Sequence, residues 1–234
     1  MMIFRFKKFA INHGNSSMRV GTDAVILGAW AKTEESETIL DIGTGCGIIA
    51  LMMAQKSQNS QITAIDIHTE SIVEARSNFE NSDWSNQLFA NQISLSELAK
   101  HLEIKFSLVI CNPPFFIDST PAPVKSRHNA RHANTLLPED FFKDASQILT
   151  EKGKIFIIIP ALGSERWLNA ATNFKLFPAR ITSVHAYSGK VKERLLLEFT
   201  FQNSNPVANE FYIREGKNLG YTESYKELTK DFYL

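Results

Sequence analysis

The sequence of 234 residues is poor in the features that define several protein classes. Its only cysteines, Cys46 and Cys111, are too few for a disulfide framework or a zinc site of four thiolates. No run of 18 apolar residues occurs, so the sequence predicts no membrane span. The N-terminal stretch MMIFRFKKFAINHG has basic residues but no apolar run before small residues, unlike a signal peptide. The expected compartment is therefore the cytosol.

Net charge is also absent, because 25 Lys and Arg residues balance 25 Asp and Glu residues. This balance argues against a wholly basic, histone-like nucleic-acid binder. The charges are nevertheless uneven. Residues 1–20 and 119–138 contain bases but no acid, whereas residues 33–118 contain twelve acids against four bases. A neutral protein can present a basic surface if its acid-free segments flank one cleft.

Apolar runs alternate with helical patterns in the order typical of a parallel sheet with crossover helices. The predicted strands are 38–42, 61–67, 87–90, 106–111 and 154–160, followed by an antiparallel pair, 181–187 and 194–201. The predicted helices are 48–57, 69–80, 94–101, 138–149 and 165–173, with a last helix between 221 and 232. We expect one α/β, Rossmann-like domain over residues 1–234, with a mostly parallel seven-stranded sheet, helices on both faces and a C-terminal antiparallel hairpin.

Two segments of this domain do not read as part of the sheet. Residues 1–37 precede the first predicted strand of the sheet, and we expect them to cover the cleft beside it. Residues 115–137 form a long connection without periodicity, in which two prolines oppose a helix. Loops of this length in compact domains are usually functional or disordered, so we expect a substrate loop here.

A glycine-rich turn, DIGTGCG over residues 41–47, joins the first strand to a helix. Glycines permit positive φ and a close approach of backbone to ligand, and the helix N-terminus offers unpaired N–H groups. The spacing is not the G-x-G-x-x-G of dinucleotide sites, and no G-K-[ST] of a P-loop follows. Asp41 would repel a pyrophosphate and favour a cation, so the turn predicts a ligand that is positively charged nearby.

A second acid, Asp66, ends the second predicted strand, where a carboxylate can accept both hydroxyls of a ribose. S-adenosylmethionine meets both requirements. Its α-amino group would lie near Asp41, its ribose near Asp66, and its methionine carboxylate near backbone N–H groups of the turn.

The fourth predicted strand ends in Asn112-Pro113-Pro114-Phe115. Ligands of open parallel sheets lie beyond the carboxyl ends of the strands, so this motif and the glycine turn should converge. Prolines fix the backbone and remove N–H donors, which leaves the Asn112 side-chain oxygen and the Pro113 carbonyl as acceptors. Two acceptors beside an aromatic ring suit a flat group that carries –NH2, and stacking on Phe115 would contribute roughly 1–3 kcal/mol.

This arrangement favours methylation of an amino group. The exocyclic amine of adenine is a poor nucleophile, because its lone pair is delocalised into the ring. Acceptors that hold its hydrogens favour a pyramidal nitrogen and free the lone pair to attack a methyl sulfonium. No strong general base is needed, since the proton becomes acidic once the new bond forms.

The motifs DIGTGCG, AIDI and NPPF, in this order, resemble those of class I S-adenosylmethionine-dependent N-methyltransferases. The stretch RVGTDAVILGAW over residues 19–30 and the C-terminal YTESY and DFYL narrow the resemblance. They look like the bacterial tRNA1(Val) adenine N6-methyltransferase family, which methylates the adenine 3′ of the anticodon, at position 37. The resemblance covers nearly the whole chain and implies S-adenosylmethionine as cofactor, tRNA as partner, and neither a metal nor a membrane.

The resemblance also implies roles for individual residues. Expected cofactor contacts are Asp41, Gly43, Gly45, Gly47, Asp66, Ile67, Gln92 and Asn112, covered by Thr22 and Asp23. Expected contacts to the target base are Asn112, Pro113 and Phe115. The family usually places an Asp where we align Gln92, and Asn91 is a possible substitute for that contact to the cofactor adenine. The final residue of NPPF is often Tyr in relatives.

Other functions remain open. Glutamine N5-methyltransferases of release factors share the NPP motif but usually carry a separate helical N-terminal domain, and this chain has only about 37 residues before its first sheet strand. Adenines of rRNA or DNA are alternative substrates, and a cofactor-binding module without chemistry is a third possibility. With an RNA substrate, the expected phosphate contacts are Arg5, Lys7, Lys8, Lys125, Arg127 and Arg131.

Overall fold

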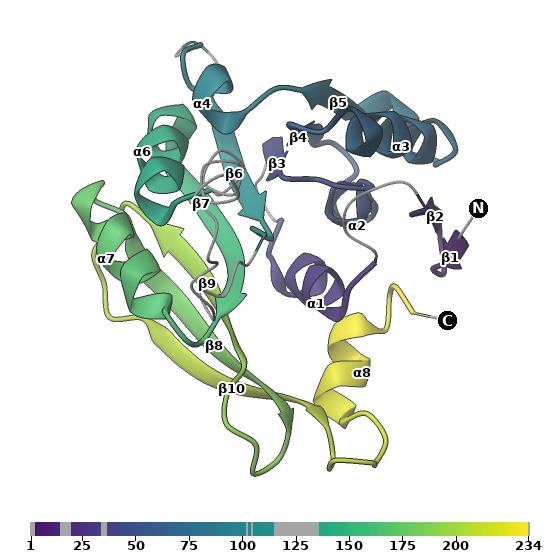
Figure 1. The fold of residues 1–234 in the computed structure, drawn as a ribbon, viewed down its shortest axis with the longest axis vertical. Helices are drawn as coiled ribbons and strands as arrows, with labels where there is room; N and C mark the ends of the chain where they lie inside the picture. Colours follow the sequence, from purple (N-terminus) through teal and green to yellow (C-terminus); the bar gives the residue numbers. More distant parts are fainter. Residues whose placement is uncertain are drawn as a thin grey trace, which may run out of the picture.

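A central eight-stranded sheet organises the protein (Figure 1). The computed structural model describes residues 3–14, 20–33, 37–101, 103, 105–114 and 136–233. Five strands run parallel in the order β7-β6-β3-β4-β5. They are β3 Thr38–Ile42, β4 Gln61–Asp66, β5 Leu88–Gln92, β6 Phe106–Cys111 and β7 Leu149–Pro160. This half confirms the parallel sheet predicted from the alternation of apolar runs and helical patterns.

The other end of the sheet contains one strand more than predicted. β9 (Arg194–Thr200) pairs antiparallel with β7 and with β8 (Phe177–Tyr187), which confirms the hairpin. β10 (Val207–Arg214) then pairs parallel with β8 and forms the edge. The expected count of seven strands is therefore wrong, since this sheet has eight. Sequence periodicity misses β10 because none of its residues is fully buried, so it carries no clear apolar alternation.

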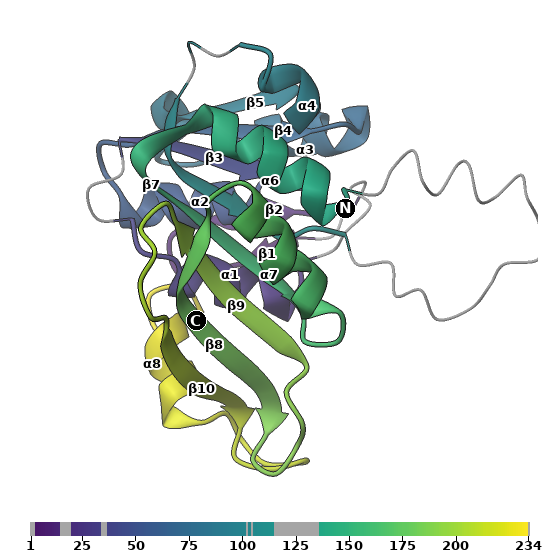
Figure 2. The same ribbon diagram turned by 90° about the vertical axis from the view of Figure 1, so that its left-hand side faces the viewer.

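Helices cover both faces of the sheet, as predicted (Figures 1 and 2). One face carries α1 Thr22–Trp30, α2 Ile48–Lys56, α3 Thr69–Glu80 and α8 Glu223–Thr229. The other carries α4 Leu95–Leu98, α6 Pro138–Ile148 and α7 Ser164–Asn173. A 3-10 turn, η1 Ser85–Gln87, precedes β5. Among the described residues, no helix is long and apolar enough to cross a membrane.

Successive side chains of β3 point to opposite faces of the sheet, so they belong to two different hydrophobic cores. Ile39 packs under α1 and α2, whereas Leu40 packs on the opposite face, under α6. Asp41 shares the face of Ile39 and therefore lies beneath α2. This placement brings an ionisable side chain into the apolar interior directly below the glycine turn.

A small hairpin of β1 (Ile3–Arg5) and β2 (Ala10–Asn12) is separate from the main sheet. The Phe6 ring stacks on Tyr233, and the Lys7 N–H donates to the Phe232 carbonyl over 2.8 Å. The hairpin is thereby tied to the C-terminal segment, and the two chain ends lie on the same side in Figure 1.

Candidate active site

The glycine turn between β3 and α2 is left-handed at each of its glycines. Gly47 has φ +85°, and a Cβ there would lie 2.5 Å from Cε1 of Phe79. The absence of a side chain at this position therefore lets the turn pack closely against Phe79 of α3. A Cβ on Gly43 or Gly45 would meet nothing within 4 Å, although both residues have positive φ. These two positions therefore present bare backbone to open space, as a close-lying ligand requires.

Asp41 lies fully buried under this turn. Its Oδ2 accepts a hydrogen bond from the Thr44 hydroxyl over 2.6 Å and another from the Ala50 N–H over 3.2 Å. Its Oδ1 has no partner among the described residues. Burial is the main reason that the pKa of this carboxyl rises from 3.8 to about 7. Asp41 therefore links the glycine turn to the first turn of α2 through these two hydrogen bonds.

Asp66, at the end of β4, also holds the turn. Its Oδ2 accepts from the Gly45 N–H over 3.0 Å and its Oδ1 from the His68 N–H over 2.9 Å. The next side chain, Ile67, is 45% exposed, which offers an apolar surface beside this carboxylate. Gln92 is paired with Asp66 in the sheet and donates to the Ile67 carbonyl over 3.3 Å. Both Asn91 and Gln92 are exposed, but Gln92 is the one bonded next to Asp66.

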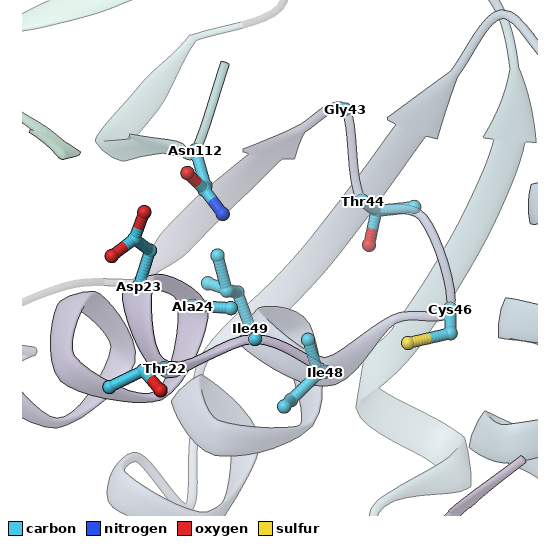
Figure 3. Close-up of a pocket in the computed structure, with 10 residues that line it drawn as sticks. Thr22, Asp23, Ala24, Gly43, Thr44, Cys46, Ile48, Ile49 and Asn112 are labelled. Atoms are coloured by element: carbon cyan, nitrogen blue, oxygen red, sulfur yellow. The ribbon is translucent and has the colours of Figure 1, made fainter. Parts of the chain in front are cut away.

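A pocket of about 360 Å³ lies between the glycine turn, the start of α1 and the end of β6 (Figure 3). Small-molecule sites typically measure roughly 300–1,000 Å³. Its lining residues are Gly21, Thr22, Asp23, Ala24, Gly43, Thr44, Cys46, Ile48, Ile49 and Asn112. The expected residues Thr22, Asp23, Gly43 and Asn112 thus come together from three separate stretches of sequence. The lining does not include the expected residues Asp41, Gly45, Gly47, Asp66, Ile67, Gln92 and Pro113. They lie in the glycine turn or at the ends of β3, β4, β5 and β6.

Asn112 directly follows β6 and faces the pocket, with its side chain opposite Asp23 in Figure 3. Its Oδ1 is buried and has no partner among the described residues. This oxygen can therefore accept a hydrogen bond from a ligand in the pocket. The backbone then turns into buried Pro113, which has no N–H and keeps a carbonyl acceptor.

The first turn of α1 forms the wall of the pocket opposite Asn112 (Figure 3). Its N-cap residue, Gly21, makes no side-chain capping bond, so the first backbone N–H groups of the helix are left for other partners. Asp23 projects from this turn, and its Oδ2 accepts from Nε of Arg194 over 2.8 Å. Arg194 is the first residue of β9, so this ion pair connects the pocket wall to the hairpin half of the sheet. Nothing in the sequence pattern indicates this role for Arg194.

The basic residues expected to contact nucleic acid are only partly described. Arg5, Lys7 and Lys8 lie on or beside the β1–β2 hairpin and are exposed. Nζ of Lys7 donates to the Lys230 carbonyl over 2.6 Å. Lys125, Arg127, Arg131 and Phe115 lie outside the described residues.

Asparagine contacts place this hairpin beside the glycine turn. Asn12 and Asn78 of α3 exchange two hydrogen bonds of 2.9 Å each, and Asn78 also donates to the Cys46 carbonyl over 2.8 Å. The extension of residues 1–37 therefore reaches the pocket in two places, through α1 and through this contact.

The remaining polar groups of the site offer no nucleophile. Burial raises the pKa of the Cys46 thiol to about 12, and burial also raises the pKa of Cys111 well above 9. Both thiols therefore stay protonated near neutral pH. Within the described part of the chain, no group of three or more His, Cys, Asp or Glu residues could hold a metal ion. The polar side chains in the described lining of the pocket are those of Thr22, Asp23, Thr44, Cys46 and Asn112.

Comparisons with solved structures agree with this geometry. A predicted O-methyltransferase from Agrobacterium tumefaciens superposes with a TM-score of 0.68 at 19% identity, covering 90% of this chain and 96% of its own. A glycopeptide N-methyltransferase complexed with S-adenosyl-L-methionine superposes with a TM-score of 0.57 at 12% identity, covering 80% and 97%. At these identities the likeness shows a methyltransferase fold.

Sequence comparisons are more specific. The methyltransferase small domain family matches residues 16–175. Two relatives named tRNA1(Val) (adenine(37)-N6)-methyltransferase, from Christiangramia forsetii and Parabacteroides distasonis, are each 38% identical over 234 residues, which is 99% of this chain and 97% of theirs. A relative of the same name from Flavobacterium psychrophilum is 36% identical and covers 99% of both chains. The chain therefore belongs to the methyltransferase small domain family and to the family of the tRNA1(Val) (adenine(37)-N6)-methyltransferases.

Proposed function

We propose that this protein transfers a methyl group from S-adenosylmethionine to the exocyclic N6 amine of adenine 37 in tRNA1(Val). The observation that carries the proposal is the Asn112 amide oxygen, which is buried, unpaired among the described residues and located in the pocket beside the glycine turn. The names of the relatives supply the substrate. A tRNA substrate places the reaction in the cytosol.

The residues present fit the cofactor. Gly43 and Gly45 leave open space where side chains would otherwise project, and this space can admit the methionine part. Asp66 at the end of β4 would accept from the ribose hydroxyls, since carboxylate oxygens keep lone pairs beyond those used by the Gly45 and His68 N–H groups. When bound, S-adenosylmethionine supplies an electrophilic methyl group on a sulfonium.

The adenine of the cofactor would lie farther along the strand ends. The exposed Ile67 side chain would pack on its face, and the Gln92 side-chain oxygen would accept from its amine. Thr22 and Asp23 would close the methionine end from α1, together with the uncapped N–H groups of that helix.

The target amine would be held by acceptors alone. The Asn112 side-chain oxygen and the Pro113 carbonyl would each accept one N6 hydrogen, which favours a pyramidal nitrogen and a lone pair free to attack. Because both groups are neutral acceptors, this chain stabilises the positive charge that develops on nitrogen, and the proton then leaves to water. Phe115 remains our candidate for stacking on the base.

A methyl-transfer assay on defined RNAs tests the proposal. The protein is expected to label a tRNA1(Val) transcript and to lose that activity when adenine 37 is replaced by guanine, which lacks the N6 amine. Mass spectrometry of the digested RNA should locate N6-methyladenosine at this position. Labelling of a release factor, with no labelling of any tRNA, would instead support a glutamine N5-methyltransferase. Cofactor binding without transfer to either substrate would support a binding module.

A further inference from the structure

The two most exposed large apolar side chains in the described part of the chain lie on neighbouring loops. Leu162, after β7, is 85% exposed, and Val191, between β8 and β9, is 75% exposed. The Ala161 N–H donates to the Glu193 carbonyl over 3.0 Å, so the two loops are in direct contact. Two contacting loops that each carry a highly exposed apolar side chain can contribute to a surface that a partner covers.

These loops lie at the same edge of the sheet as the pocket. β7 runs parallel to β6, so its last residue, Pro160, lies at the edge where β6 leads into Asn112. β9 starts at this edge, with Arg194 paired to Pro160. Arg194 in turn holds Asp23 of the pocket wall, so the loop between β8 and β9 ends one residue before a pocket contact.

The β8–β9 turn, residues 188–193, is held firmly by its backbone. The Lys190 N–H donates to the Tyr187 carbonyl over 3.1 Å, and the Lys190 carbonyl lies 2.6 Å from Nδ1 of His185. The Glu193 N–H donates to the Val184 carbonyl over 2.9 Å. A turn fixed in this way presents its outward side chains in one arrangement before any partner binds, which lowers the entropy cost of binding.

The side chains on this turn are those of a nucleic-acid contact. Lys190 and Lys192 flank Val191, and all three are exposed. Neither ammonium group has a hydrogen bond or an ion pair with the described residues. By contrast, Lys226 of α8 bonds to Glu223 over 2.5 Å, and Lys230, just after α8, bonds to Glu227 over 2.6 Å. The turn thus places two lysines on either side of an apolar residue, and Glu193 at its end is the acid within these six residues.

We propose that this turn, together with Leu162, is a second RNA-binding surface that contacts the stem next to the target loop. Lys190 and Lys192 would bind phosphates, and Val191 with Leu162 would pack against a ribose or base face. This proposal rests on the proposed function, because a tRNA whose loop enters the pocket must extend beyond it. In Figure 1 the β1–β2 hairpin lies to the right of α1 and the β8–β9 turn lies below it, so the two would contact the RNA at different places.

The test measures tRNA affinity as a function of salt concentration. The double variant Lys190→Gln/Lys192→Gln removes both charges and keeps side-chain length. Its affinity for tRNA1(Val) is expected to fall about tenfold at low salt, and the slope of log K against log salt should decrease by about two. A matched control, Lys100→Gln/Lys152→Gln, removes two exposed lysines away from this edge and should behave as wild type. The variant Leu162→Ala/Val191→Ala should weaken binding about threefold without changing the slope.

The outcomes separate this proposal from the function itself. Wild-type protein that methylates tRNA, with the same affinity and salt slope in both lysine variants, would overturn the second surface and leave the function intact. Wild-type protein without methyl transfer to any tRNA would overturn the function first. A change in sedimentation of the turn variants, with tRNA affinity unchanged, would assign the surface to a second copy of the chain and also overturn the RNA contact.

Discussion

On the glycine-turn side of the pocket, the carboxylates of Asp41 and Asp66 accept hydrogen bonds from backbone N–H groups and a threonine hydroxyl. On the β6 side, the amide oxygen of Asn112 has no partner among the described residues. Four hydrogen bonds thus hold the carboxyl groups of the first wall in place, although Asp41 Oδ1 has no partner among the described residues. The Asn112 oxygen differs because its residue lines the pocket, where a ligand can donate to it. Under the proposed function, the first wall would be a scaffold for the cofactor, and the second would be where the reacting amine binds.

The largest expected effect is on the β6 side. Asn112→Ala removes the unpaired acceptor, and kcat for tRNA methylation should fall about 10²–10³-fold, as when one preorganised hydrogen-bonding group is lost from a transition state. S-adenosylmethionine affinity, measured by calorimetry, should change much less. The control Asn169→Ala alters an exposed asparagine of α7 and should leave both quantities unchanged. A variant with normal kcat and weak cofactor binding would show that Asn112 belongs to the scaffold side.

The next prediction tests whether packing against α3 holds the glycine turn in place. Gly47→Ala places a Cβ 2.5 Å from Phe79 in a left-handed conformation, and we expect a loss of about 2–5 kcal/mol in unfolding free energy. Gly163→Ala is a matched control, because its φ of +81° is similar but its Cβ would meet nothing within 4 Å. This control should cost only about 1–2 kcal/mol in urea denaturation. Equal losses in the two variants would mean that packing against α3 does not hold the turn.

The scaffold side was largely predictable from sequence, because its signals are local. A strand, three glycines and a helix occupy consecutive residues. On the β6 side the signal is also local, since Asn112 directly follows an apolar strand. Parallel pairing then brings the ends of β3 and β6 to one edge, so two separate motifs predict one pocket. The sequence does not indicate which atoms of Asp41 are used, since its burial depends on α2 packing above it.

Features that depend on distant contacts were not predictable. Asp23 and Arg194 are 171 positions apart, and neither lies in a pattern that indicates the other. β10 pairs with β8 although its exposed residues show no apolar alternation. The β8–β9 turn reads as a short charged loop in sequence, and only the sheet order places it at the pocket edge.

A third prediction concerns Asp41, whose Oδ1 has no hydrogen-bond partner among the described residues. The pKa of Asp41 is raised from 3.8 to about 7 in the folded protein, so the folded state holds this proton more tightly than the unfolded state. Ionising Asp41 therefore costs stability as pH rises from about 4 to about 7, and the cost is constant above that. Asp41→Asn keeps an oxygen for Thr44 and removes the charge. Relative to wild type, it should gain about 2–4 kcal/mol between pH 4 and pH 8.

Urea denaturation of both proteins across this pH range measures the difference. Glu97→Gln is the comparison, because Glu97 is fully exposed and its pKa is lowered by hydrogen bonds to Ser94. Any pH effect of that substitution should be small and of opposite sign. A difference between wild type and Asp41→Asn that does not vary with pH would mean that the carboxyl is ionised in the folded protein at no cost.

The smallest expected effect concerns the ion pair between Asp23 of α1 and Arg194 of β9. Arg194→Ala removes the partner of Asp23, and both side chains are partly exposed, at 33% and 29%. Such pairs contribute about 0.2–1 kcal/mol, so the KM for S-adenosylmethionine should rise by no more than about fivefold as Asp23 loses its fixed position. kcat should change little, and Arg194→Lys should restore part of the affinity, because Lys keeps the charge without the planar guanidinium. A rise in the KM for tRNA, with cofactor KM unchanged, would move Arg194 from the pocket wall to the RNA surface of the neighbouring turn.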